Sequence, residues 1–136
     1  MKGWKKAVAI TVVGVGLPML VVSTVQPAEE SLNVVRDMVT TEIVDREPMN
    51  NGAAFSASMG PVYYFTEVNG AHTPTHITHI WYYKGTQIAE VPLFVEGPRW
   101  RTWSSKRILQ DWAGSWSVEA VDADGNVLSS KAFDVH

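Results

Sequence analysis

Residues 115–135, SWSVEAVDADGNVLSSKAFDV, decide the fold of this 136-residue chain. Residues 115–120 alternate strictly, with tryptophan, valine and alanine on one side and serine and glutamate on the other. Such an alternation is typical of a strand that buries one face. Asp124-Gly125 follows, and this pair is the strongest short-range signal for a β-hairpin. We therefore expect residues 127–135 to return antiparallel to residues 115–121.

Four segments upstream also predict strands, because they are rich in β-branched and aromatic residues and most end at turn residues. They are residues 34–44, 62–68, 76–85 and 86–97. Between the first two, residues 45–61 hold two prolines, two asparagines and two glycines, which indicates a long loop. Apolar residues at helical spacing predict a short helical turn over residues 107–114, ended by Gly114.

The side-chain parity of two of these strands predicts what they bury. If Trp81 points inward, a period of two takes Ile77, His79 and Tyr83 inward with it. In residues 86–97 one face collects four apolar side chains, while Pro92 on the opposite parity cannot donate to a neighbouring strand. Residues 86–97 are therefore expected to form an edge strand or to contain a bulge. Its residues Gln87 to Val95 are our candidate edge for recruiting a partner by strand addition.

Six or seven short strands separated by turn signals predict an all-β fold, an immunoglobulin-like antiparallel β-sandwich over residues 34–136. Trp81 and Trp116 would anchor its core. An open barrel with similar strand spacing is the alternative. With 46% hydrophobic and 18% charged residues, the composition is that of an ordinary globular domain. The absence of cysteine excludes disulfides, thiolate nucleophiles and a lipid-modified cysteine.

The first residues predict export. Lys2, Lys5 and Lys6 precede an apolar run over residues 7–22 that is short for a membrane span and is broken by two glycines and a proline. We interpret residues 1–23 as a signal peptide or an uncleaved anchor, and residues 24–33 as a linker. The domain is then expected in the periplasm or outside the cell, or tethered to the inner membrane if the segment stays uncut.

The densest chemistry lies in RWRTWSSK, residues 99–106, where arginine, tryptophan and lysine crowd together. One interpretation is a binding surface, because tryptophan and arginine are enriched at interaction hot spots. The other is an internal ladder of arginines on indole faces, which would fasten a crossover segment against the sheet. The candidate binding residues are Arg99, Trp100, Arg101, Trp103, Ser104 and Lys106.

Catalytic and metal sites find weaker support in the sequence. His72, His76 and His79 form the one metal-like cluster, but an odd step along a strand sends His76 and His79 to opposite faces. Ser104 and Ser105 lack a nucleophile elbow and an indicated histidine–acid partner. Four glutamates offer a carboxylate pair, but in half-buried strands they mark solvent faces. They are Glu67, Glu90, Glu96 and Glu119.

Several motifs together resemble the bacterial Domain of Unknown Function 2914. They are YYFTEVNG at residues 63–70, HIWYYKG at 79–85, GPRWRTWSSK at 97–106, GSWSVEAVDADG at 114–125 and the closing VLSSKAFDV. The resemblance runs from about Val34 to the C-terminus. It implies a small domain of bacterial envelope-associated proteins, often joined to a membrane segment, and it implies no established activity.

The sequence thus predicts a non-catalytic interaction or structural module of the cell envelope, without cofactor or metal. Its partner would be a protein or a glycan of the envelope. If the lysines near the N-terminus are removed, 8 basic residues face 14 acidic ones, a net charge of −6, which argues against a nucleic-acid partner. The first alternative is a carbohydrate-binding module that stacks sugars on exposed, coplanar Trp100 and Trp103. A second is a small metal-dependent enzyme built on the three histidines.

Overall fold

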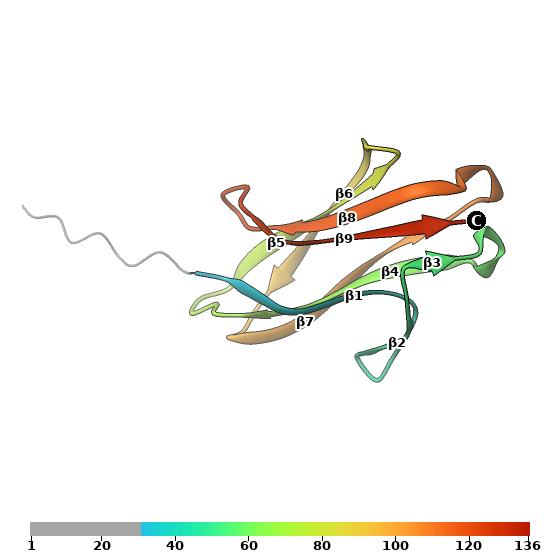
Figure 1. Ribbon diagram of the computed structural model, residues 1–136. Helices are drawn as coiled ribbons and strands as arrows, with labels where there is room; N and C mark the ends of the chain where they lie inside the picture. Colours follow the sequence, from blue (N-terminus) through green and yellow to red (C-terminus); the bar gives the residue numbers. More distant parts are fainter. Residues whose placement is uncertain (1–30) are drawn as a thin grey trace, which may run out of the picture.

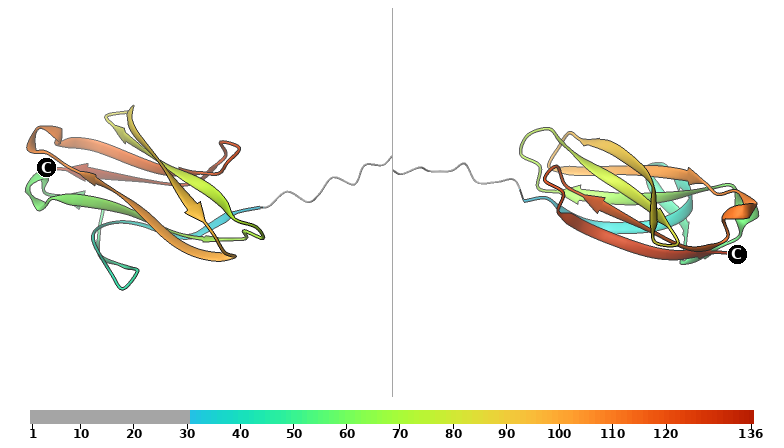
Figure 2. Two further views of the ribbon diagram at one scale, coloured as in Figure 1. Left: turned by 180° about the vertical axis from the view of Figure 1, so that it is seen from behind. Right: turned by 90° about the horizontal axis from the view of Figure 1, so that it is seen from above.

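The computed structural model describes residues 31–136, which form two β-sheets that lie face to face (Figure 1). The predicted export segment and residues 24–30 of the linker lie outside the described residues. Views from behind and from above show residue 31 and the C-terminus at opposite ends of the sandwich (Figure 2). The nine strands are β1 (Asn33–Val44), β2 (Glu47–Asn51), β3 (Ala54–Phe55), β4 (Pro61–Asn69), β5 (Thr75–Tyr83), β6 (Thr86–Val95), β7 (Arg99–Arg107), β8 (Gly114–Val121) and β9 (Val127–Val135).

The five-stranded sheet has the order β3-β9-β8-β5-β6 and contains the predicted hairpin. Strands β8 and β9 pair antiparallel, with Trp116 opposite Phe133, and β5 pairs with β8 so that Trp81 lies opposite Val118. All four of these side chains are buried, and Trp81 is 0% exposed. The predicted core anchors are therefore confirmed. Strand β6 is the edge of this sheet, also as predicted.

The four-stranded sheet has the order β2-β1-β4-β7. Strand β4 pairs antiparallel with β7 along nine residues, from Pro61 opposite Arg107 to Asn69 opposite Arg99. The RWRTWSSK stretch is thus an edge strand and not a crossover segment, which corrects the interpretation from sequence. Nine strands replace the expected six or seven, and they form two separate sheets rather than a barrel. Every pair is antiparallel except β3 with β9, which run parallel.

The predicted long loop over residues 45–61 is wrong in its first half. Strands β1 and β2 form a hairpin whose turn residues, Asp45 and Arg46, have φ values of 51° and 64°. Two successive positive φ angles are characteristic of the tight type I′ turn. Such turns normally carry asparagine or glycine, so an arginine there hid the hairpin in the sequence. Figure 1 shows this hairpin projecting from the outer side of the four-stranded sheet.

A short 3-10 helix, η3 (Gln110–Trp112), connects β7 to β8 and confirms the predicted helical turn. Gly114 follows with a φ of 135°, a region that favours glycine. Another 3-10 turn, η2 (Ala57–Met59), lies between β3 and β4. Within residues 31–136 no helix has the length and apolar character needed to span a membrane.

Candidate functional site

Strand β7 divides the six candidate residues between two faces. Because side chains alternate along a strand, Arg99, Arg101 and Trp103 lie on the outer face of the four-stranded sheet. Trp100 packs against the core between the sheets, and Ser104 is buried there. Lys106 shares their parity and is half-buried. The strand therefore brings the candidates together in sequence but assigns them to two different environments.

Two glutamates organise the outer face. Glu67 on β4 is only 6% exposed and accepts hydrogen bonds from Arg36 at 2.9 Å and from Arg99 at 3.0 Å. Glu47, from the β1–β2 hairpin, pairs with Arg36 at 2.8 Å and with Arg101. Glu67 thus lies on an outer face, as predicted, but the arginines that cover it leave it buried rather than exposed to solvent. Glu90 and Glu96 are exposed, whereas Glu119 is half-buried and accepts from the Tyr82 hydroxyl at 2.8 Å.

These contacts keep both carboxylates ionised. Burial tends to raise the pKa of Glu67, but hydrogen bonds and charges from Arg36 and Arg99 outweigh it and leave the pKa below its ordinary value. The hydrogen bond from Arg36, assisted by Arg101, lowers the pKa of Glu47 to about 2 against the opposing effect of desolvation. In return, Glu47 and Glu67 raise the pKa of Arg36. The network thus binds β1, the hairpin, β4 and β7 to one another.

An aromatic stack lies beside this network. The Trp103 indole stacks on the Phe65 ring, with centroids 6.3 Å apart and planes inclined by 14°. The Arg36 guanidinium lies 5.0 Å from the Phe65 centroid, and that of Arg46 lies 5.6 Å from Trp103. Arg99 and Arg101 do not stack on the indoles of their own strand. Trp100 points to the face opposite both arginines, and the guanidiniums that share the face of Trp103 pair with Glu67 and Glu47 instead. The stacking cations therefore come from β1 and its hairpin.

On the inner face, Ser104 belongs to a buried polar cluster. Its Oγ lies 2.7 Å from His79 Nδ1 and accepts a hydrogen bond from Trp81 Nε1 at 3.1 Å. His79 Nε2 lies 3.1 Å from the Thr66 hydroxyl, which itself donates to the Thr102 carbonyl at 3.1 Å. Because the Thr66 hydroxyl already donates its proton to Thr102, it must accept a hydrogen bond from the Nε2–H of His79. The Nδ1 atom of His79 is then unprotonated and accepts a hydrogen bond from the Ser104 hydroxyl. One neutral tautomer of His79 therefore satisfies every group in the cluster.

Burial governs the titration of His79. Its side chain is 0% exposed, and desolvation lowers its pKa to about 3. A histidine does stand next to Ser104, which the sequence did not indicate, but its second nitrogen contacts Thr66 rather than a carboxylate. His76 lies exposed on the opposite face of β5. Within residues 31–136 no group of three or more potential ligands is placed to hold a metal ion.

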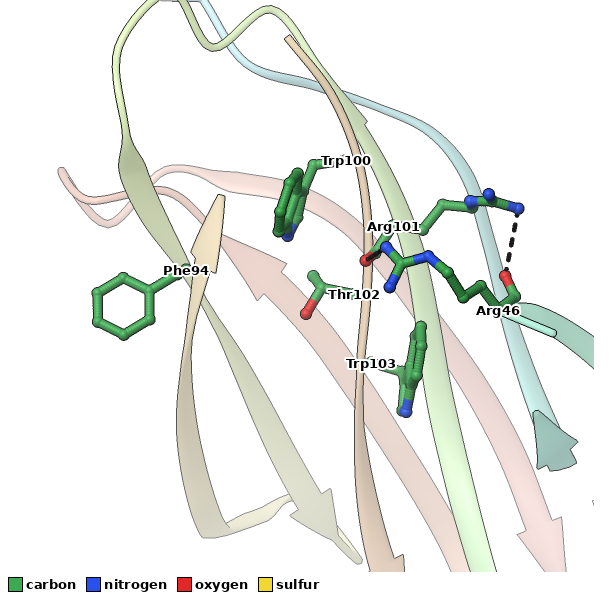
Figure 3. A pocket seen from close by; sticks show the side chains of 6 residues that line it. All are labelled: Arg46, Phe94, Trp100, Arg101, Thr102 and Trp103. Carbon is green, nitrogen blue, oxygen red and sulfur yellow. Dashed lines mark hydrogen bonds between the residues drawn. The ribbon is translucent and has the colours of Figure 1, made fainter. Parts of the chain in front are cut away.

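A hollow of about 300 Å³ opens beside β7 on the side away from β4 (Figure 3). It is lined by Arg46, Phe94, Trp100, Arg101, Thr102 and Trp103. A second hollow of about 270 Å³ adjoins it, because both share Phe94. Phe94 is 74% exposed on the outward parity of β6, and Figure 3 shows its ring turned away from the indoles. Sequence reasoning missed Arg46 and Phe94, although an outward-facing phenylalanine on a predicted edge strand was a readable signal.

Comparison with protein families agrees with the resemblance noted in the sequence. Residues 74–135 match the model of the family described as "Protein of unknown function (DUF2914)". These residues are a DUF2914 segment. The DUF2914 segment spans the whole of β5 to β9, and so contains all six candidate residues. Arg36, Arg46, Glu47 and Glu67, which hold the outer face together, lie before it.

Two further comparisons extend beyond the DUF2914 segment. No curated protein matches the chain. Among solved structures, a β-glucosidase from Kluyveromyces marxianus matches 79% of this chain and 14% of its own, with 10% identity and a TM-score of 0.45. For a β-D-glucoside glucohydrolase from Trichoderma reesei, the match covers 79% of this chain and 19% of the enzyme, with 10% identity and a TM-score of 0.43. The chain spans less than one fifth of either enzyme, and a likeness of this degree supports no argument about activity.

The buried carboxylate between the arginines yields a stability prediction. We expect Glu67→Gln to lower the free energy of unfolding by about 1–2 kcal/mol, because an amide keeps the shape but loses charge-assisted hydrogen bonds to Arg36 and Arg99. Urea unfolding followed by tryptophan fluorescence measures the change. Glu90→Gln, at an exposed position of β6, is the matched control and should stay within about 0.5 kcal/mol of the parent. Equal effects of the two substitutions would show that the ion-pair network contributes nothing.

Proposed function

We propose that the chain is an exported, non-catalytic interaction module of the cell envelope, and that the hollow beside β7 is its contact surface for a protein partner. The observation that carries this proposal is the gathering of Trp100, Trp103 and Arg101 around one open hollow. Tryptophan and arginine are the side chains most enriched at binding hot spots. The polar cluster around His79 is closed to solvent and is better suited to holding the sheets together.

The strand connections support an immunoglobulin-like assignment within the β-sandwich. In that fold the first, second and fifth strands share one sheet, while the third, sixth and seventh share the other. Strands β1, β4 and β7 follow the first pattern, and β5, β8 and β9 follow the second, with β6 added at the edge. Trp81 on β5 then takes the place of the buried tryptophan found on the third strand of antibody domains. Many cell-surface domains share this sandwich, so the architecture agrees with a binding module by analogy of fold.

Export is supported by residues 1–23 alone, where three lysines precede an apolar run. Envelope-associated placement also agrees with what the resemblance to DUF2914 implies. A protease added to spheroplasts with an intact inner membrane tests it, since a C-terminal tag should be cleaved only if the domain lies outside the cytoplasm. Protection of the tag until the membrane is lysed would contradict export.

A carbohydrate-binding module is the second candidate, favoured by two indoles at one hollow. Sugar stacking requires an open indole face. Trp103 is stacked on Phe65 and contacted by Arg46, and Trp100 packs against the core, so neither indole is a free platform. These contacts favour a protein partner over a glycan. A metal-dependent enzyme is favoured least, because His76 and His79 lie on opposite faces of β5.

Site-specific photo-crosslinking in intact cells tests the contact surface. A photoreactive phenylalanine analogue replaces Phe94 at the hollow or Val127, which is 57% exposed at the start of β9. We expect a discrete protein adduct from position 94, and none from position 127. The adduct should disappear when Arg101→Glu is combined with the probe at position 94.

Three results would contradict the proposal. Absence of an adduct at position 94 would indicate a purely structural module. Equal adducts from both positions would indicate contact without a defined surface. Glycan binding by the purified domain that is lost in Trp103→Ala, with no protein adduct, would establish the carbohydrate-binding alternative in its place.

A further inference from the structure

The open edge of β7 is the feature that says most about the partner. Strand β7 is the last strand of its sheet and has one strand neighbour, β4, among residues 31–136. Immunoglobulin sandwiches of seven strands carry one more strand at this position. Here the chain passes from β6 to β7 without it. An edge of this kind presents unpaired N–H and C=O groups to any extended chain that approaches.

The register identifies which backbone groups face outward. The Gly70 N–H donates to the Pro98 carbonyl at 3.0 Å, and pairs of an antiparallel ladder alternate between bonded and non-bonded. Residues of even number in β7 therefore face β4, and those of odd number face the open edge. The Arg101 carbonyl confirms this direction, because it accepts a hydrogen bond from the Arg46 guanidinium at 3.0 Å instead of from β4. Trp103 and Ser105 present their N–H groups on the same side.

The other long edge is less suited to an incoming strand. Strand β6 contains Pro92, which has no N–H, and Pro92 is accommodated opposite Thr78 in the ladder with β5. Glu90 adds a negative charge to that edge. Strand β7 contains no proline over its nine residues. Of the two edges that border the hollow, β7 is the better suited to pairing, which revises our candidate edge at Gln87 to Val95.

Charge decides what can occupy the edge. Strand β7 carries Arg99, Arg101, Lys106 and Arg107 and no acidic residue. Arg99 has 80% of its side chain exposed, and no ion pair within residues 31–136 reaches Lys106 or Arg107. A second copy of β7 would bring cations against cations, and this disfavours self-pairing. An acidic strand would instead meet arginines across the new pair.

We propose that β7 binds an extended peptide segment of a partner protein by strand addition, and that acidic residues alternate with apolar residues in this segment. In such a strand, side chains on the outer face would meet Arg99 and Arg101, and those on the inner face would enter the hollow beside Trp100 and Thr102. Main-chain hydrogen bonds supply the affinity and the alternating side chains supply the specificity. The inference rests on the proposed function, because it names the partner class for the same surface.

Arg46 is the group that the incoming strand replaces. Its guanidinium covers the Arg101 carbonyl and lies over Trp103, so it closes the middle of the edge in the free protein. A peptide N–H would take over the Arg101 carbonyl and release the arginine. Removal of this cap should therefore strengthen binding, whereas removal of an ordinary contact residue would weaken it.

The test uses a fluorescent peptide of alternating glutamate and valine and the full chain. Fluorescence anisotropy measures the dissociation constant at low salt. A peptide of the same composition with glutamates and valines in separate blocks is the sequence control. A third peptide is N-methylated at alternate residues, which removes the backbone donors that strand addition needs.

Two substitutions at one position separate strand addition from surface charge. Ser105→Pro removes an N–H on the open edge, where proline is tolerated, and Ser105→Ala keeps it. We expect Ser105→Pro and N-methylation each to weaken binding at least tenfold, and Ser105→Ala to change it less than twofold. Arg99→Glu should also weaken binding tenfold, and Arg46→Ala should strengthen it several-fold. Melting curves of both Ser105 variants that overlay the parent confirm an intact fold.

The outcomes separate this inference from the proposed function. If the peptide binds but Ser105→Pro and N-methylation have no effect, the surface attracts acidic chains without strand addition and the inference is wrong. If no peptide binds while the probe at Phe94 gives its adduct, the inference fails and the interaction surface stands. If neither peptide nor adduct is found, both fail.

Discussion

Replacing Trp116 by alanine should lower the free energy of unfolding by about 3–5 kcal/mol, the usual cost of truncating a buried aromatic side chain. The indole is 2% exposed and stacks on Phe133 with centroids 5.9 Å apart. Tyr83 and Trp112 contact it as well, and its N–H donates to the Trp112 carbonyl at 2.9 Å. No smaller side chain can fill that space or satisfy that carbonyl.

Thermal and urea unfolding of the two proteins measure the loss. Domains of this size commonly have a free energy of unfolding of about 5–15 kcal/mol. A loss of about 3–5 kcal/mol is a large part of that value, so the melting midpoint of the variant should fall well below that of the parent. Phe94→Ala is the matched control, because it removes an aromatic ring that is 74% exposed. Its melting midpoint should equal that of the parent. A Trp116→Ala protein as stable as the Phe94→Ala protein would refute the core assignment.

The second large effect is a loss of stability in mild acid caused by His79. The pKa of this histidine falls from an ordinary value of 6.5 to about 3 because burial disfavours the imidazolium ion. The unfolded chain therefore binds one more proton than the folded chain between these two pH values. Stability is complete above pH 6.5 and decreases as the pH falls toward 3, by about 1.4 kcal/mol for each pH unit.

Protonation of His79 also breaks its hydrogen bonds. An imidazolium would direct a second N–H at Ser104 Oγ, which already accepts from Trp81 and would lose the acceptor for its own proton. Urea unfolding of the parent and of His79→Gln between pH 7 and pH 4.5 isolates this effect, because glutamine does not titrate. The difference in unfolding free energy between the two proteins should shrink as the pH falls. A difference that is constant with pH would contradict the buried neutral tautomer.

The sequence was sufficient for the sheet that carries the most regular alternation. Trp81, Trp116 and the Asp124-Gly125 turn were readable because each depends on local rules: a period of two along a strand and a turn that needs glycine. The edge position of β6 followed from Pro92 for a similar reason. These features depend on a residue and its near neighbours in the chain, and the structure agrees with them.

The outer face of the four-stranded sheet was beyond this kind of reasoning. Glu67 is buried because Arg36 and Arg99 reach it from two other strands, and nothing within its own segment reveals that. Arg46 reaches β7 only because an uncommon turn folds the hairpin over the sheet. The division of RWRTWSSK into an outer and an inner face depends on the pairing of β7 with β4. Long-range partners, and not local propensity, decide the surroundings of these residues.

The position of β7 between two groups of strands has a consequence for where this protein can be divided. The segment that matches DUF2914 begins at residue 74, but β7 hydrogen-bonds to β4, which precedes it. Without the residues before 74, β7 would lose its neighbour β4, and the inner face of the other sheet would lose β1 and β4, which help to cover it. The stretch defined by family similarity is therefore shorter than the autonomous folding unit. A fragment that begins at residue 74 would be an aggregating chain rather than a small domain.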